Sequence, residues 1–142
     1  SLRPRGRLAV LAYHSLEDVV VPPAAVPELV TFVEALRKKY GVPIAVFGHA
    51  GDGNFHVTPM KGEDLSPESW YPLSKNLLKE LYEEVLRLGG TISGEHGIGR
   101  KRVGDLPLAL SEAEYETMRA LKRAMDPQGV LNPGVLFPLE EA

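Results

Sequence analysis

Two histidines, His49 and His56, flank a short turn in the stretch HAGDGNFH. Apolar residues lead up to the first histidine and alternate with polar residues around the second, as in two strands joined by a tight turn. The sequence contains no cysteine, so the side chains available to a metal ion are imidazoles and carboxylates. The stretch therefore predicts a hairpin that holds a metal ion between two imidazoles.

The number of residues in the turn decides whether both histidines can face one ion. A loop of two or four residues places His49 opposite Asn54. One face of the sheet then carries His49, Asn54, His56 and Thr58. Diagonal neighbours such as the two histidines lie about 7 to 8 Å apart at Cα, a span that two imidazoles can close around an ion at about 2.0 to 2.1 Å per Zn–N bond. A three-residue loop would put the histidines on opposite faces and exclude a shared site.

A second pair of reactive side chains, Glu95 and His96, lies between glycines in the stretch GEHGIG at residues 94–99. Glu95 or a neighbour is the expected third ligand, because two histidines and one carboxylate leave open positions on zinc, manganese or iron. His96 would then stay free to act as general base, since an imidazole with its ordinary pKa of about 6.5 suits proton removal at neutral pH. His14 is expected to be an ordinary solvent or packing residue.

Strand-like and helical patterns alternate along the chain. The strand-like runs are 7–14, 17–21, 44–47, 54–60 and 91–93, and the first two form either one bent strand or two. Helical spacing of apolar residues covers 26–40 and 66–88, with the regular part of the second helix expected to begin near Pro72. The order strand, helix, strand, strand, helix, strand predicts a ferredoxin-like α+β unit, an antiparallel sheet with helices on one face.

A third helix is predicted to begin with a capping box formed by Ser111 and Glu114 and to end before Pro127. The apolar residues expected to point inward from this helix are Tyr115, Met118, Leu121 and Met125. The basic run at 100–102 is expected to be a solvated loop, and the alternative is a contact with an acidic partner or substrate.

Composition excludes several classes of protein. The 142 residues suit a single domain, and a net charge of −3 implies neither a nucleic-acid nor an anionic-membrane partner. No run of about 18 apolar residues is present, so no transmembrane helix is predicted. The glycines at 94–99 follow the pattern GxxGxG rather than the GxGxxG dinucleotide fingerprint, and no phosphate-binding P-loop is present. Absence of cysteine favours the cytoplasm.

Three motifs in this order carry a family resemblance: HAGDGNFH at 49–56, SGEHGIGR at 93–100 and MDPQGVLNPG at 125–134. Together they resemble the C-terminal cap domain of FAD-linked 2-hydroxy-acid oxidases and dehydrogenases. That family includes the flavin subunit of glycolate oxidase and the D-lactate and D-2-hydroxyglutarate dehydrogenases. The likeness extends from about Glu17 to Phe137.

The resemblance implies a role for each of these residues. In the family, the counterparts of His49, His56 and Glu95 bind a divalent metal, expected here to be Zn or Mn, that grips the hydroxyl and carboxylate of the substrate. His96 resembles the base that takes the hydroxyl proton while the α-hydrogen leaves as hydride to FAD. Asn132 matches a residue near the flavin.

Asn54 and Thr58 are the expected substrate-binding residues. Thr58 stands where some relatives have an asparagine that touches the substrate, which leaves the size of the substrate open. The family's FAD-binding domain, and the first part of the cap with an arginine for the substrate carboxylate, are absent from this sequence. Residues 1–142 are therefore expected to form the C-terminal part of a cap domain that is inactive alone.

The expected partners are a small 2-hydroxy acid of the glycolate or D-lactate type and the N-terminal FAD domain. An iron–sulfur or second flavin subunit is a further candidate, with a location in the cytoplasm or at the periphery of the inner membrane. Two other classes also fit the residues: a stand-alone metal-dependent hydrolase, in which the ion activates water, and a non-catalytic ferredoxin-like binding module. Metal-dependent esterase or amidase activity would favour the hydrolase, whereas absence of metal and of flavin-dependent activity would favour the binding module.

Overall fold

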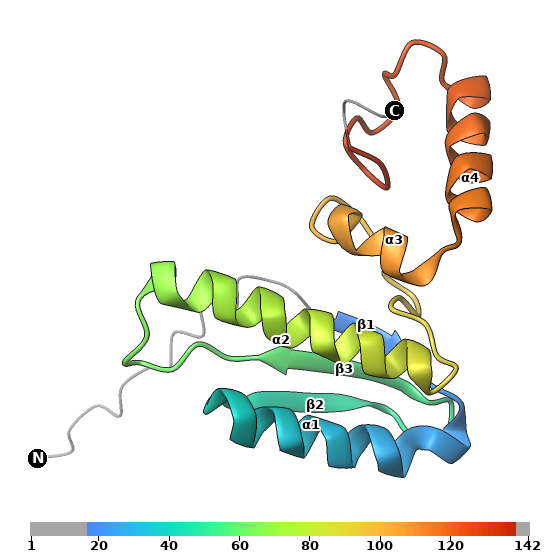
Figure 1. The fold of residues 1–142 in the computed structure, drawn as a ribbon. Coiled ribbons are helices and arrows are strands. Elements are labelled where there is room, and N and C mark those ends of the chain that lie inside the picture. Colours follow the sequence, from blue (N-terminus) through green and yellow to red (C-terminus); the bar gives the residue numbers. More distant parts are fainter. Residues whose placement is uncertain (1–16, 139–142) are drawn as a thin grey trace, which may run out of the picture.

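The computed structural model describes residues 17–138. The predicted strand at 7–14 and His14 lie outside the described residues. A layer of sheet and helices forms the first part of the described chain, and a smaller C-terminal lobe lies beside one end of this layer (Figure 1).

The sheet has three antiparallel strands, β1 (Glu17–Val20), β2 (Ile44–His49) and β3 (Asn54–Pro59), in the order β1–β3–β2. Thr91 pairs with Val20 in an isolated antiparallel bridge on the side of β1 that β3 leaves open. The predicted strand at 91–93 is therefore reduced to one bridge, but it occupies the position of the fourth strand in a ferredoxin-like sheet. The predicted α+β class is confirmed.

Two long helices, α1 (Val26–Tyr40) and α2 (Pro67–Arg87), cover one face of the sheet (Figure 1). The core lies between this face and the helices, and its fully buried residues include Val19, Leu29, Val33, Ile44, Val57, Leu77, Leu81 and Tyr82. Apolar residues three or four apart give each helix one buried stripe, which is the packing that the sequence pattern predicts.

Helix α2 begins at Pro67, earlier than the regular start expected near Pro72. The Ser66 hydroxyl accepts a hydrogen bond from the Ser69 N–H at 3.2 Å, so the first turn is capped. Pro72 removes one backbone donor inside the helix without ending it.

The C-terminal lobe contains two helices, α3 (Leu106–Ala109) and α4 (Glu112–Met125), and short 3-10 turns occur at Pro23–Ala25 and Val103–Asp105. The predicted capping box at the start of α4 is present, because the Glu114 carboxylate accepts from the Ser111 N–H at 2.8 Å and the Ser111 hydroxyl accepts from the Glu114 N–H at 3.4 Å.

The prediction that the apolar residues of α4 point into a core is wrong for Leu121 and Met125, whereas Tyr115 and Met118 are half-buried. No residue of this helix is buried, and Leu121 and Met125 are 58% and 80% exposed. The physical reason is that α4 lies in the lobe away from the sheet, where Tyr115 packs edge-on against Phe137 with 5.3 Å between ring centroids. Among the described residues, no helix is both long and apolar enough to cross a membrane.

Candidate active site

The loop between β2 and β3 comprises four residues, 50–53, so His49 pairs with Asn54 and Phe47 pairs with His56. The even number confirms the parity on which a shared site depends. Within the turn, Asp52 N–H donates to His49 C=O at 3.0 Å. Gly53 is required where the turn meets β1, because its φ is +71° and a Cβ there would lie 1.9 Å from the Val21 carbonyl oxygen.

Strand β3 divides its side chains between two faces. Phe55 and Val57 are buried on the side of the helices, whereas Asn54, His56 and Thr58 alternate with them and are half-buried on the other face. Asn54 Oδ1, His56 Nδ1 and Thr58 Oγ1 are buried atoms without a hydrogen-bond partner among the described residues. Buried polar atoms are rarely left unpaired, so this row suits a polar ligand or ion.

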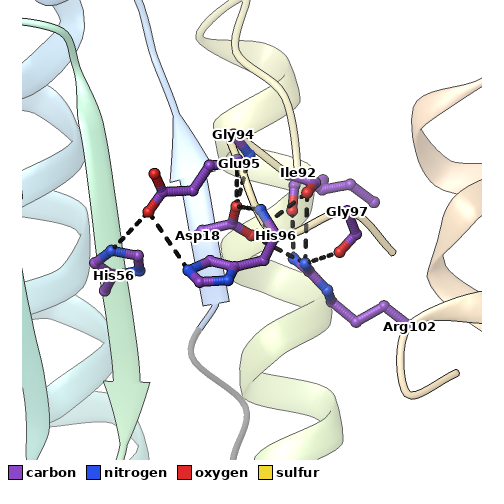
Figure 2. Close-up of polar contacts among 9 residues, drawn as sticks. Asp18, His56, Ile92, Gly94, Glu95, His96, Gly97 and Arg102 are labelled. Carbon is purple, nitrogen blue, oxygen red and sulfur yellow. Dashed lines mark hydrogen bonds and ion pairs between the residues drawn. The ribbon is translucent and has the colours of Figure 1, made fainter. Parts of the chain in front are cut away.

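The loop that follows α2 brings Glu95 and His96 to the same face (Figure 2). Glu95 Oε1 lies 3.3 Å from His56 Nε2 and 3.4 Å from His96 Nε2. The rings of His56 and His96 meet edge-on, with centroids 5.4 Å apart. One donor atom from each of these three residues lies within 4.8 Å of the others, which is close enough to hold one metal ion.

His49 is not a member of this three-residue group. It is exposed and lies at the end of β2, on the face of His56 and one diagonal step from it. The structure thus brings together His56, Glu95 and His96 from the predicted set and leaves His49 beside them.

Asn132, the predicted flavin-side residue, is exposed in the C-terminal lobe. Its carbonyl accepts the Val135 N–H at 3.1 Å in the turn that follows α4. Figure 1 shows the segment that follows α4 in the C-terminal lobe, away from the sheet.

Asp18, a site residue that sequence reasoning missed, is fully buried in β1 directly opposite His56. Its Oδ2 accepts three consecutive backbone N–H groups, those of Gly94 at 3.0 Å, Glu95 at 2.6 Å and His96 at 2.7 Å. Burial raises the pKa of Asp18, but the His96 and Glu95 N–H donors and the Arg102 guanidinium outweigh it and hold the pKa below its usual value. Asp18 is therefore a carboxylate. The available signal was an acidic residue directly before a run of three valines in a predicted strand.

Arg102 also departs from its prediction. The run 100–102 is solvated at Arg100 and Lys101, as expected, but Arg102 is only 7% exposed. Its Nη2 lies 2.9 Å from Asp18 Oδ1 in a buried ion pair. The expectation of a solvated side chain fails because Arg102 is the guanidinium that compensates a buried carboxylate.

The model of a protein family described as FAD linked oxidases, C-terminal domain, matches residues 7–136. The chain belongs to this family. Among curated proteins, this C-terminal domain is 38% identical to the glycolate oxidase subunit GlcD of Bacillus subtilis (strain 168) over 122 residues, which are 86% of this chain and 26% of that protein.

Two further relatives of the FAD-linked oxidase domain are dehydrogenases. It is 39% identical to the D-lactate dehydrogenase of Archaeoglobus fulgidus over 117 residues, 82% of this chain and 25% of the relative. It is 33% identical to the D-2-hydroxyglutarate dehydrogenase of Stutzerimonas stutzeri (strain A1501) over 122 residues, 84% of this chain and 26% of the relative. The resemblance read from the three motifs is confirmed, and the chain spans about a quarter of the length of these relatives.

Proposed function

We propose that this domain carries the substrate-oxidising groups of an FAD-dependent oxidoreductase that converts a small 2-hydroxy acid to the 2-oxo acid. The observation that carries the proposal is the Glu95 carboxylate, which lies between the rings of His56 and His96 on the face of the sheet opposite the helices. The family description and the names of the relatives support the reaction class. A glycolate or D-lactate type of substrate is the proposed specificity.

In the proposed reaction, His96 takes the proton of the substrate hydroxyl at a ring nitrogen. FAD, held by a partner domain, would supply the acceptor for the α-hydrogen, which would leave with its two electrons as hydride. Loss of one proton and one hydride converts the hydroxyl carbon to a carbonyl. The His96 side chain is half-exposed, so a substrate can reach it, and it lies beside a carboxylate that stabilises the imidazolium it would become.

We propose His49, His56 and Glu95 as ligands of a divalent ion, Zn or Mn. The donor set fits, because imidazole and carboxylate suit both ions. His56 is mostly buried, and its Nδ1 has no hydrogen-bond partner in the described part of the chain. The ion would act as a Lewis acid on the substrate oxygens. His49 is the ligand with the weaker support, since it lies on the same face but outside the three-residue group.

Asn54 and Thr58 are the proposed substrate-binding residues. Support comes from two buried oxygens, Asn54 Oδ1 and Thr58 Oγ1, which have no hydrogen-bond partner within residues 17–138 and lie on the same strand and face as His56. A ligand hydroxyl that donates a hydrogen bond would satisfy either oxygen, and a ligand carboxylate could accept from the Thr58 hydroxyl or the Asn54 amide N–H.

The partner that we propose is an FAD-binding domain, on the same or a separate polypeptide, and we use "assembled flavoprotein" for this domain together with it. The relatives are about four times as long as the matched region, which leaves room for such a domain. The apolar side chains on α4 and just after it expose a surface that it can cover: Leu121, Met125, Val130 and Leu131. Asn132 follows this surface directly and is proposed to lie near the flavin.

A cytoplasmic or peripheral inner-membrane location, with an iron–sulfur or second flavin subunit as electron acceptor, completes the proposal.

The experiment is anaerobic reduction of the assembled flavoprotein by glycolate, D-lactate and D-2-hydroxyglutarate, followed through the absorbance of oxidised flavin. At least one of these acids should bleach the flavin and yield its 2-oxo acid. His96→Ala should lower the rate by about 10²- to 10⁴-fold while FAD stays bound. Near-normal rates in this variant would remove His96 as the base, and no flavin reduction by any 2-hydroxy acid would overturn the proposed reaction.

A further inference from the structure

We infer that Asp18 and Arg102 are positioning residues that hold the loop 92–97 so that Glu95 and His96 face His56. The inference rests on the proposed function, because the groups that the pair would position are the proposed ligand and base. Neither residue belongs to the three motifs. Asp18 precedes α1 in the sequence, and Arg102 follows α2.

The middle of the loop is held by Asp18. One carboxylate oxygen receives the N–H groups of Gly94, Glu95 and His96, all within 3.0 Å. Three successive donors that converge on one oxygen give the backbone a concave form typical of anion-binding nests. The anion here is a side chain of the protein, so the loop is shaped from inside rather than by a ligand.

Both ends of the loop are held by Arg102 (Figure 2). Its Nη1 donates to the Ile92 carbonyl at 2.7 Å, and its Nη2 donates to the Gly97 carbonyl as well as to Asp18. The planar guanidinium thus joins the residues before and after the reactive pair to the carboxylate between them.

Gly94 keeps the loop close to the sheet. A Cβ at this position would lie 2.6 Å from Val20 Cγ2 and 3.0 Å from Asn54 Oδ1, so only glycine permits this approach to β1 and β3. The Gly94 N–H also donates to the Asp18 carbonyl at 3.0 Å.

The register between β1 and β3 places Asp18 next to His56. Asp18 pairs directly with His56 across β1 and β3, and side chains in such pairs have Cβ atoms about 4.5 to 5.5 Å apart. Asp18 therefore holds the backbone of Glu95 and His96 at a point next to the ring that both must face. The separations of 3.3 and 3.4 Å at Glu95 Oε1 depend on this arrangement.

Substitution of Asp18 distinguishes a positioning role of the Asp18–Arg102 pair from a purely stabilising role. Asp18→Asn keeps the size of the side chain but removes the charge that three N–H groups and the guanidinium share. A positioning role predicts that kcat/KM of the assembled flavoprotein falls by about 10²-fold, since a displacement near 1 Å is enough for a loss of that size. FAD content should be unchanged, because the altered contacts lie within this domain.

Two further readouts do not depend on turnover. Amide hydrogen exchange at 94–96 should be slow in the unchanged protein and at least tenfold faster in Asp18→Asn, while exchange in α2 stays the same. The affinity for added Zn²⁺ should be about 10- to 100-fold weaker in Asp18→Asn, as for other changes to groups that orient metal ligands. A stabilising role alone would leave Zn²⁺ affinity and kcat/KM unchanged in the folded variant.

Glu80→Gln is the matched control, because it also converts a carboxylate to an amide but lies between α1 and α2, where it accepts from Lys39 and Tyr40. All three readouts should stay at their original values in this variant. Arg102→Lys replaces Asp18→Asn if the latter does not fold. This variant keeps the positive charge but loses the planar, forked set of guanidinium N–H donors. It should show the same changes in kcat/KM, amide exchange and Zn²⁺ affinity to a smaller extent.

The outcomes separate the inference from the proposed function. Folded Asp18→Asn with unchanged exchange at 94–96, unchanged Zn²⁺ affinity and unchanged kcat/KM would overturn the inference. If the unchanged protein neither binds Zn²⁺ nor oxidises 2-hydroxy acids, the proposed function fails. The exchange measurement then still decides whether Asp18 holds the loop.

Discussion

Glu95 places one carboxylate oxygen beside two imidazoles, and this contact is the reason to treat the three residues as one chemical group. The side chains differ in accessibility, since that of His56 is 14% exposed and those of Glu95 and His96 are about half-exposed. A mostly buried imidazole therefore lies next to an accessible carboxylate and an accessible second imidazole.

The residue-scale prediction concerns metal content. Elemental analysis of the purified protein should find a divalent ion, and His56→Ala should lose it, because the mostly buried imidazole is the best-positioned of the proposed ligands. Glu95→Gln should weaken binding, since a neutral amide is a poorer ligand for Zn or Mn than a carboxylate. Unchanged metal content in His56→Ala would contradict the ligand assignment, and Glu80→Gln serves again as the carboxylate control.

At the scale of elements, the hairpin depends on a four-residue turn whose last residue, Gly53, packs against the backbone of Val21 just after β1. Gly53→Ala should lower the free energy of unfolding by about 1–3 kcal/mol, because it adds a Cβ at positive φ and against the Val21 carbonyl oxygen. Urea denaturation of the chain measures the change. Gly51→Ala, in the same turn, places the added Cβ more than 4 Å from the side chains and backbone of all described residues except its two chain neighbours and should be nearly neutral. Equal effects of the two substitutions would argue against this account of the turn.

The contact between α1 and α2 predicts how stability depends on pH. Hydrogen bonds from Lys39 and Tyr40 hold the pKa of Glu80 below its usual 4.5, whereas burial and the Glu80 carboxylate raise the pKa of Tyr40 to about 12. Stability from a lowered carboxyl pKa is present above the unfolded value of 4.5 and is lost as pH falls. Stability from a raised tyrosine pKa is present below its unfolded value of 10.0 and is lost as pH rises towards 12.

Denaturation at a series of pH values tests this contact. The free energy of unfolding should fall below about pH 4.5 and again above about pH 10, and Glu80→Gln should flatten both slopes. Other carboxylates with lowered pKa, such as Glu84 and Asp126, also contribute on the acid side. The difference between the unchanged protein and Glu80→Gln is therefore the quantity to compare. An identical alkaline slope in both would show that Glu80 does not act on Tyr40.

At the scale of the whole molecule, the sheet-and-helix layer and the C-terminal lobe differ in how they bury apolar residues. The layer has a continuous core, whereas α4 buries no residue and exposes Leu121 and Met125. A helix with an uncovered apolar face is typical of a surface that another domain contacts.

The corresponding prediction is that Met125→Asp weakens docking of the FAD-binding domain. A charge in a desolvated contact should cost about tenfold or more in affinity, equal to about 1.4 kcal/mol or more. Hydrogen exchange of α4 in the assembled flavoprotein should become faster, and turnover should fall. Tyr71→Asp, which alters a side chain that is 73% exposed on α2, is the control and should change neither. Protection of α4 that persists in Met125→Asp would place the FAD-binding domain elsewhere.

Local patterns in the sequence were enough to predict much of this protein. Periodicity located the two long helices and the three strands of the sheet, turn chemistry gave a hairpin of the correct parity, and Ser111 with Glu114 predicted the cap of α4. These features depend on residues a few positions apart, which is why they can be read from the chain itself. The three motifs likewise identified the family.

Contacts between distant segments were decided only by the tertiary structure. The register of β1 on β3 sets Asp18 beside His56, and the path of the loop after α2 decides that Glu95 and His96 join His56 while His49 stays outside their group. The sequence pattern predicts a solvated loop at Arg102 because its buried partner, Asp18, is distant in the sequence. A buried charge must find its partner wherever the fold places one, so this pair, and the loop that it holds, follow from long-range packing and not from local propensity.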